Sequence, residues 1–155
     1  MPKKKRKQIK YYYASDLHEK AVEISKLMFP HVDVSRIKCF RSTGSSTKGT
    51  IARCHGMAKI MQLTAEIKPH YAIEFISERF DRMSQEDQVK VIIHELMHIP
   101  FNFGGGFKHH NYVTEGNVNQ MYRNYIKEKR NQDKSQEEKK FLIIPNLTFK
   151  NKKIN

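Results

Sequence analysis

The sequence predicts a single α+β domain in which a small mixed or antiparallel sheet packs on one helix, with further helices on its flanks. Three observations favour this class. The chain has 155 residues, a length that suits one domain with tails. Apolar residues recur at helical spacing in several segments, and short segments rich in aromatic and β-branched residues lie between them. Nine Phe and seven Tyr residues supply large side chains for a core.

The first expected element is a helix that begins near Ser15. Ser15 suits the N-cap position, and Pro30 stops the apolar periodicity. The residues that form its apolar face are Leu17, Ala21, Ile24, Leu27 and Met28.

Strands are expected in the middle of the chain. Residues 36–41 and 51–55 have strand composition and flank a loop rich in Gly, Ser and Thr, which predicts a hairpin with Cys39 and Cys54 facing each other. The segment 57–68 fits either a strand or a helix. Residues 71–76 alternate in polarity and are expected to form another strand.

Two further helices are expected. The clearest helix in the chain runs from about Gln85 to Ile99, with Ser84 and Asp87 in a pattern similar to a capping box. A glycine-rich loop (103–107) follows. After it, Val118, Met121, Tyr122 and Tyr125 form the apolar face of a further helix.

Charge is distributed unevenly along the chain. Lys+Arg 29 against Asp+Glu 16 gives a net charge of +13, and the first ten residues carry no acid. We therefore expect a disordered basic tail (1–12), the folded domain (13–130), and a polar linker with a C-terminal apolar segment able to dock (131–155). Neither a secretory signal nor a membrane span is recognisable, and two cysteines exclude a disulfide framework. An intracellular, cytoplasmic location without membrane partners is expected.

The expected chemistry lies in the helix over residues 85–99, which contains the motif His94-Glu95-Leu96-Met97-His98. Imidazoles at positions i and i+4 project from the same side of a helix, so both can reach one metal ion. Glu95 lies to one side, where it can take a proton from a metal-bound water without being a ligand. Two solvated histidines on an amphipathic helix would have the same spacing, so the motif alone leaves both interpretations open.

A third metal ligand is expected downstream, because catalytic zinc usually has three protein ligands and one open position. The candidates are His109, His110 and Glu115, which follow a loop that can turn the chain back toward the helix. Glu115 fits equally well in the first turn of the next helix, with Thr114 as its cap.

Four blocks of sequence agree in order and spacing with a known family. They are IARCHGMAKIMQL (51–63), PHYAIEFISERFD (69–81), VIIHELMHIP (91–100) and FGGGFKHHNYV (103–113). The stretch 36–125 that contains them resembles the phage and archaeal metallopeptidase family, a zincin group related in motif to SprT-like proteases. The resemblance implies a zincin-like fold with one Zn²⁺, with His94 and His98 as ligands and Glu95 as general base.

The resemblance also implies that the third ligand comes from the His109-His110 pair. The family pattern of a His followed by an acidic residue favours His110, although Asn111 stands at the acidic position here. A SprT-like alignment would instead favour His109. We take His110 as the third ligand and His109 as the alternative.

The resulting hypothesis is a zinc-dependent peptidase acting on polypeptides. A zinc-activated water loses a proton to Glu95 and attacks the peptide carbonyl, and Glu95 returns the proton to the leaving amine. The strand 71–76 is expected along the cleft, where an extended substrate could pair with it, and Tyr112 is a candidate donor to the oxyanion. The alternative is a nucleic-acid-binding protein with a structural zinc site. Such a site needs four protein ligands, and His109 and His110 together could complete the set begun by His94 and His98.

The positive charge favours anionic partners. DNA or RNA contacts are expected in the basic tail and in the acid-free span 34–65, so the substrates could be proteins associated with nucleic acid, by analogy with SprT-like proteases. The candidate contacts are Lys3, Lys4, Lys5, Arg6, Lys7, Arg36, Lys38, Arg41, Lys48 and Arg53.

Overall fold

A mixed sheet of four strands organises the fold. The computed structural model describes residues 8–143. Within them the strand order is β1-β2-β4-β3, with β2 and β4 parallel and the other two pairs antiparallel. The predicted α+β class is confirmed, and the arrangement is consistent with a zincin-like fold. The strands are β1 (Lys10–Tyr13), β2 (Ile37–Thr43), β3 (Ala52–Gly56) and β4 (Tyr71–Ile76).

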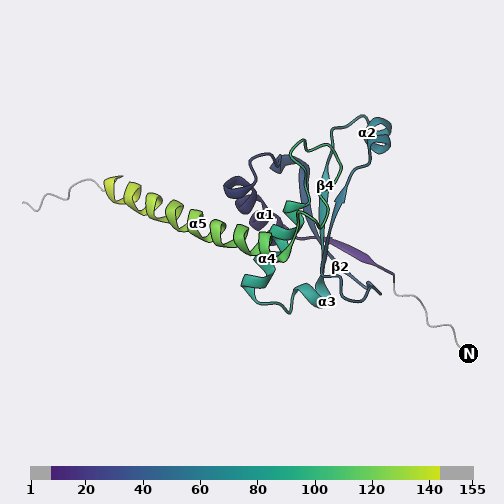
Figure 1. Ribbon diagram of the computed structural model, residues 1–155, viewed down its shortest axis with the longest axis horizontal. Helices are drawn as coiled ribbons and strands as arrows, with labels where there is room; N and C mark the ends of the chain where they lie inside the picture. The colour runs from purple at the N-terminus through teal and green to yellow at the C-terminus, as the bar shows by residue number, and fades with distance from the viewer. Residues whose placement is uncertain (1–7, 144–155) are drawn as a thin grey trace, which may run out of the picture.

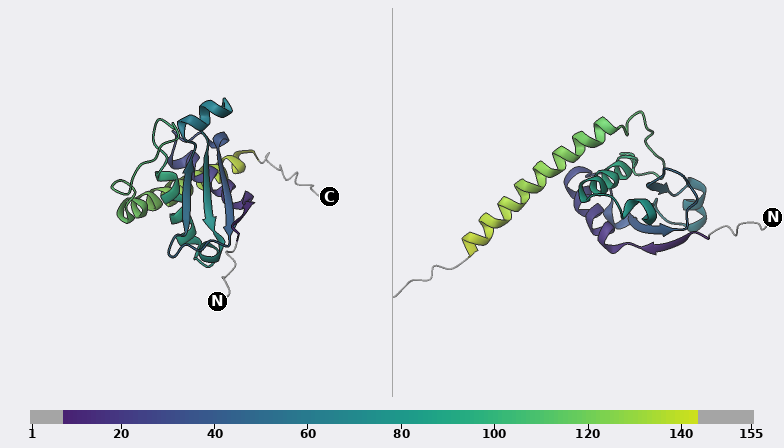
Figure 2. Two further views of the ribbon diagram at one scale, coloured as in Figure 1. Left: turned by 90° about the vertical axis from the view of Figure 1, so that its right-hand side faces the viewer. Right: turned by 90° about the horizontal axis from the view of Figure 1, so that it is seen from below.

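The main helices lie on one side of this sheet. α1 and α4 cover one face, here called the inner face, and α5 packs against both helices before it extends away from the domain (Figure 1). No helix of the described part of the chain crosses the opposite, outer face, and α2 and α3 lie near the two ends of the strands (Figure 2). The helices are α1 (Ser15–Met28), α2 (Lys59–Ala65), α3 (Ser77–Phe80), α4 (Gln85–Met97) and α5 (Glu115–Ile143), with a 3₁₀ turn η1 (Val34–Arg36).

The hydrophobic core fills the space between the inner face and the helices. Strand side chains alternate between the two faces, and Ile73 and Phe75 of β4 therefore point inward, where they have no exposed surface. Ile24 of α1 and Ile93 of α4 are equally buried in the same cluster. Burial of each such side chain contributes roughly 1.5–3 kcal/mol, which fixes α4 against the sheet.

The predicted hairpin of residues 36–55 is wrong. β4 lies between β2 and β3, so that Cys39 and Cys54 do not face each other but both pair with Ile73. β4 is buried at almost every position and therefore takes the centre of the sheet. The connection over residues 44–51 is long enough to cross the roughly 10 Å between strands that are not neighbours.

Several predicted boundaries also change. Ala14, not Ser15, is the N-cap of α1, and the ambiguous segment 57–68 forms the short helix α2. The expected tail 1–12 ends before β1, because Lys10–Tyr13 pairs with β2.

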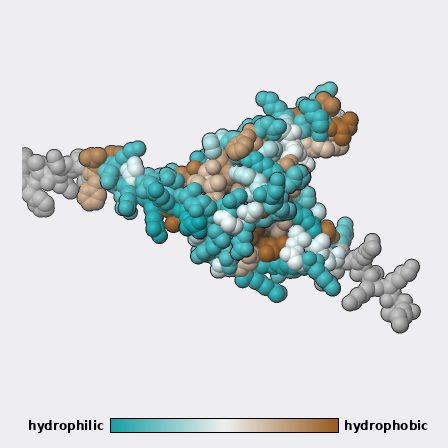
Figure 3. All heavy atoms as spheres, viewed as in Figure 1, coloured by the Kyte–Doolittle hydropathy of each residue, from teal (hydrophilic) through white to brown (hydrophobic). Residues whose placement is uncertain are grey.

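The C-terminal prediction also changes. Residues 131–143, expected as a linker, continue α5, since the segment is rich in Lys, Glu and Gln and contains no Gly or Pro. The part of α5 that projects from the domain is mostly hydrophilic on the face seen in Figure 3. The remaining parts of the predicted terminal segments, 1–7 and 144–155, lie outside the described residues. Among residues 8–143, no helix combines the length and the apolar character needed to cross a membrane.

Candidate metal centre

The helix α4 carries the motif on the side that faces β3. It begins after Ser84, whose hydroxyl accepts a hydrogen bond from the Asp87 N–H at 3.1 Å, so the predicted cap is confirmed. The buried residues Ile92, Ile93 and Leu96 pack into the core. His94 and His98 remain half-buried and line a cavity at the edge of the sheet.

Three histidines converge on one point. The Nε2 atoms of His94 and His98 are 3.2 Å apart, and the ring of His110 lies 5.7 Å and 4.9 Å from the two α4 rings, measured between centroids. Their ligand nitrogens all lie within 4.8 Å of one another, as a metal ion requires. His109 is not part of this cluster; its carbonyl instead accepts hydrogen bonds from the next turn of backbone.

Backbone contacts fix the orientation of His98. Its Nδ1 lies 2.6 Å from the carbonyl oxygen of Lys108, and the Lys108 N–H donates to the His98 carbonyl at 2.8 Å. Because a carbonyl only accepts, Nδ1 carries the proton and Nε2 keeps its lone pair for a metal. Burial lowers the pKa of His98, and burial with the neighbouring imidazoles lowers the pKa of His94 to about 4. Both rings are therefore neutral at pH 7, the form that binds metals.

The glycine-rich loop reaches the site by packing on the end of β3. A Cβ atom at Gly56 would lie 2.4 Å from the carbonyl oxygen of Gly105. A Cβ atom at Gly105 would lie 2.3 Å from the carbonyl oxygen of Met57, and Gly105 has a φ of +97°. Only glycine permits this close approach of two backbones.

Two buried polar side chains hold the same loop. The Tyr71 hydroxyl accepts from the Gly105 N–H at 2.8 Å and donates to the Gly106 carbonyl at 2.9 Å. The Gln62 amide donates to the carbonyls of Met57 at 2.7 Å and Gly104 at 3.0 Å. Sequence reasoning missed both roles, because Tyr71 fits any apolar strand position and Gln62 lies in a segment of ambiguous structure.

Glu95 lies beside the cluster and faces the edge of the sheet. The residue is 6 % exposed, and its carboxylate accepts a hydrogen bond from the backbone N–H of Cys54. Burial raises the pKa of Glu95 to about 7, although the Cys54 hydrogen bond opposes this shift. The carboxyl group is thus held between α4 and β3.

The strand beside the site is β3, and the expectation that residues 71–76 line the cleft with a free edge is wrong. β4 pairs with a strand on each side and has no free edge. On either side of β3, the carbonyl of Ile51 accepts from the N–H of Ile76, and the N–H of Met57 donates to the carbonyl of His70. In an antiparallel pair this pattern directs the backbone groups of the odd-numbered residues of β3 toward β4. Ala52 and Cys54 therefore direct their backbone groups toward α4.

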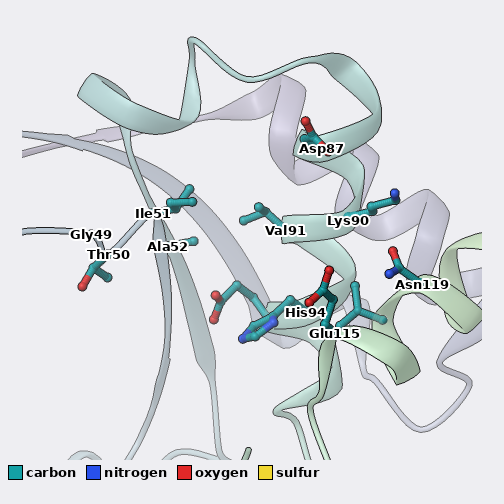
Figure 4. Close-up of a pocket in the computed structure, with 12 residues that line it drawn as sticks. Gly49, Thr50, Ile51, Ala52, Asp87, Lys90, Val91, His94, Glu115 and Asn119 are labelled. Carbon is teal, nitrogen blue, oxygen red and sulfur yellow. The ribbon is translucent and has the colours of Figure 1, made fainter.

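A groove runs along this free edge. Two adjoining cavities of about 500 and about 550 Å³ share Thr50, Ala52, His94 and Glu95. In the first cavity, Ile51 and Val91 point toward each other, with His94 at one end (Figure 4). The second cavity continues past His98 to residues 107–110. His94 and Glu95 thus line both cavities, and His98 and His110 line the second.

Comparison with known proteins identifies the family. The family model described as "Putative phage metallopeptidase" matches residues 9–129, which is more than half of the chain. The chain belongs to this family. The predicted resemblance to phage metallopeptidases is confirmed, whereas a relation to SprT-like proteases stays a prediction. No curated protein and no solved structure gives a significant match.

Membership of the phage metallopeptidase family indicates a peptidase that acts on polypeptides with a metal ion.

Two further candidate residues lie away from the histidine cluster. Tyr112, the candidate oxyanion donor, is 38 % exposed and lies outside both cavities, with the Lys108 ammonium 4.1 Å from its ring centroid. Glu115 lines the first cavity but is not part of the histidine cluster.

The arginines among the expected nucleic-acid contacts have partners within the chain. Arg36 donates a hydrogen bond to Asp33 at 2.8 Å, and Arg41 forms a bidentate ion pair with Asp16. Arg53 bonds to Thr47 at 3.2 Å and lies 3.8 Å from Glu74. Lys38 and Lys48 are exposed, and the basic residues of positions 3–7 lie outside the described residues.

Proposed function

We propose that the chain is a zinc-dependent peptidase in which His94, His98 and His110 hold the metal and Glu95 is the general base. The observation that carries the proposal is the convergence of three imidazole nitrogens within 4.8 Å of one another, next to a buried carboxylate in an open groove. A surface pair of solvated histidines would have neither the third imidazole nor the buried carboxylate.

The donor set fits a catalytic zinc ion. Three neutral imidazoles are a ligand set that zinc uses in catalytic sites, where the fourth position stays open for water or substrate. The alternative, a structural zinc site, needs a fourth protein ligand, and among the described residues His109 does not join the cluster. The groove beside the three histidines supplies the space that an open position requires.

Glu95 moves the proton in the proposed reaction. When bound, Zn²⁺ polarises the peptide carbonyl and brings the pKa of a coordinated water down to about 7. Glu95 accepts a proton from the attacking water at its carboxylate and returns it to the nitrogen of the leaving amine. The N–H of Cys54 holds that carboxylate at the edge of the groove, which Glu95 lines together with His94, His98 and His110.

The substrate in this proposal is an extended polypeptide bound along β3. The backbone groups of Ala52 and Cys54 face the groove, and they can form strand-like hydrogen bonds with a peptide. The peptide bond to be cleaved would then lie next to Glu95. The role of Tyr112 as an oxyanion donor and the association of substrates with nucleic acid remain predictions.

The test is the variant Glu95→Gln, which keeps the shape of the side chain and removes its basicity. We expect it to bind zinc as the wild type does and to hydrolyse a quenched fluorescent peptide library about 10²- to 10⁴-fold more slowly. Zinc content measured on the same samples separates loss of the base from loss of the metal. Wild-type turnover in the zinc-loaded variant would contradict the assigned role.

A further inference from the structure

Three tyrosines in β1 are unusually exposed. Tyr11, Tyr12 and Tyr13 have 59 %, 53 % and 56 % of their surface accessible. Side chains alternate along a strand, so Tyr11 and Tyr13 share one face of the sheet and Tyr12 lies on the other. Tyr13 pairs with Phe40, which belongs to the outer face because its neighbours Ile37 and Cys39 point into the core. Aromatic rings gathered on an exposed face indicate an interaction surface.

The aromatic side chains on this face are Tyr11, Tyr13 and Phe40, and we call them the aromatic cluster. The rings of Tyr13 and Phe40 are 6.1 Å apart between centroids and meet edge to face. Tyr11 and Tyr13 are two residues apart along β1, roughly 6.6 Å, which is about twice the thickness of one stacked base. Each tyrosine ring can therefore receive a separate flat partner. The ring of His18 in α1 also lies 5.8 Å from the Tyr13 ring, and within residues 8–143 no helix crosses the outer face of the sheet (Figure 2).

Positive charge flanks the aromatic cluster. Lys38 is exposed on the same face, two residues before Phe40 on β2. Arg53 of β3 lies in the same row of the sheet, because Phe40 and Arg53 both pair with Glu74.

The carboxylate on this face does not oppose an anionic ligand. Glu74 is only 2 % exposed, and it accepts hydrogen bonds from Ser42 at 2.6 Å and from His55 at 2.7 Å, with Arg53 at 3.8 Å. Its charge is thus engaged inside the sheet, whereas Lys38 and the tyrosine rings reach solvent.

We propose that the outer face binds single-stranded nucleic acid. Bases stack on the aromatic cluster, and Lys38 contacts a phosphate. Aromatic rings on an open sheet next to cations are the combination that binds single strands, whereas in a duplex the base faces are covered. A second copy of this chain is a poor occupant, because two basic faces would repel each other. This binding function lies on the face of the sheet opposite the helices and does not depend on peptidase activity.

The test measures the affinity of the full chain for labelled dT20, rU20 and a 20-base-pair duplex by fluorescence anisotropy at several salt concentrations. We expect Tyr11→Ala and Tyr13→Ala each to raise the Kd for single strands by about 5- to 150-fold. Tyr12→Ala is the matched control, since it removes a similarly exposed tyrosine from the other face of the same strand, and it should change the Kd less than twofold. Tyr11→Phe keeps a stacking ring and should retain affinity.

Other outcomes would overturn the proposal. Unchanged affinity in the Tyr11 and Tyr13 variants, or equal losses in all three alanine variants, would leave only general attraction between a basic chain and phosphates. Tighter binding of the duplex, or no binding of dT20 and rU20 at 100 mM salt, would contradict it as well. Lys38→Ala should lower the slope of log Kd against log salt by about 1. Glu95→Gln should bind like the wild type, which keeps this test separate from that of the peptidase.

Discussion

Gly56 determines where the glycine-rich loop can lie, so we expect its replacement by alanine to lower both the stability of the fold and the affinity for the metal. The new Cβ atom would stand 2.4 Å from the Gly105 carbonyl oxygen and 2.9 Å from Cζ of Phe107. Normal van der Waals contact needs about 3.5 Å, so the backbones must separate by about 1 Å. Forcing one methyl group into a packed contact costs roughly 1–3 kcal/mol. The loop also leads to His110, so the displacement should weaken metal binding.

The assay compares Gly56→Ala with Gly106→Ala. A Cβ atom at Gly106, in the same loop, would meet nothing within 4 Å. Urea unfolding of the metal-free proteins should show Gly56→Ala less stable by about 1–3 kcal/mol and Gly106→Ala within about 0.5 kcal/mol of the wild type. Zinc titration should show weaker binding only in Gly56→Ala. Equal unfolding midpoints and zinc affinities for the two variants would refute this account of the loop.

Two further predictions concern stability. Tyr71→Phe removes the hydroxyl that bonds to Gly105 and Gly106, and it should lower the free energy of unfolding in urea by about 1–2 kcal/mol; no change would show that water replaces these bonds. Burial raises the pKa of Glu23, but hydrogen bonds, with that from Lys129 foremost, lower it to about 2. Its stabilising effect is therefore complete above about pH 5 and is lost as the pH falls toward 2. Because the carboxylate is partly exposed, we expect Glu23→Gln to reduce the acid-dependent loss of unfolding free energy by up to about 1 kcal/mol. An unchanged dependence of the unfolding free energy on pH would contradict the pairing of Glu23 with Lys129.

Local features of the site could be predicted from the sequence. The cap at Ser84, the apolar face of α4 and the spacing of His94 and His98 depend on residues within one helix, where periodicity is informative. The segments of β2, β3 and β4 could be predicted as well, because strand composition and alternation are also properties of neighbouring residues. The family resemblance favoured His110 over His109, and the structure places His110 next to His94 and His98.

Features that depend on distant parts of the chain could not be predicted. The order of the sheet follows from the burial of β4 between two strands, and the adjacency of 36–41 and 51–55 in the sequence suggested a hairpin instead. The free edge therefore belongs to β3, and its Cys54 N–H meets Glu95. β1 was missed because Lys10–Tyr13 directly follows a run of basic residues. The length of α5 was underestimated because charged residues continue a helix without an apolar face.

The central claim is that His94, His98 and His110 together hold the metal ion. The most direct measurement is zinc affinity by competition with a chromophoric chelator, comparing His110→Ala with His109→Ala. The adjacent histidines differ by one position, but only His110 belongs to the cluster. We predict one zinc ion per chain in the wild type and in His109→Ala, and an affinity at least about 100-fold weaker in His110→Ala, which loses one of three ligands. Equal affinities in the two variants, or a loss confined to His109→Ala, would contradict the assignment.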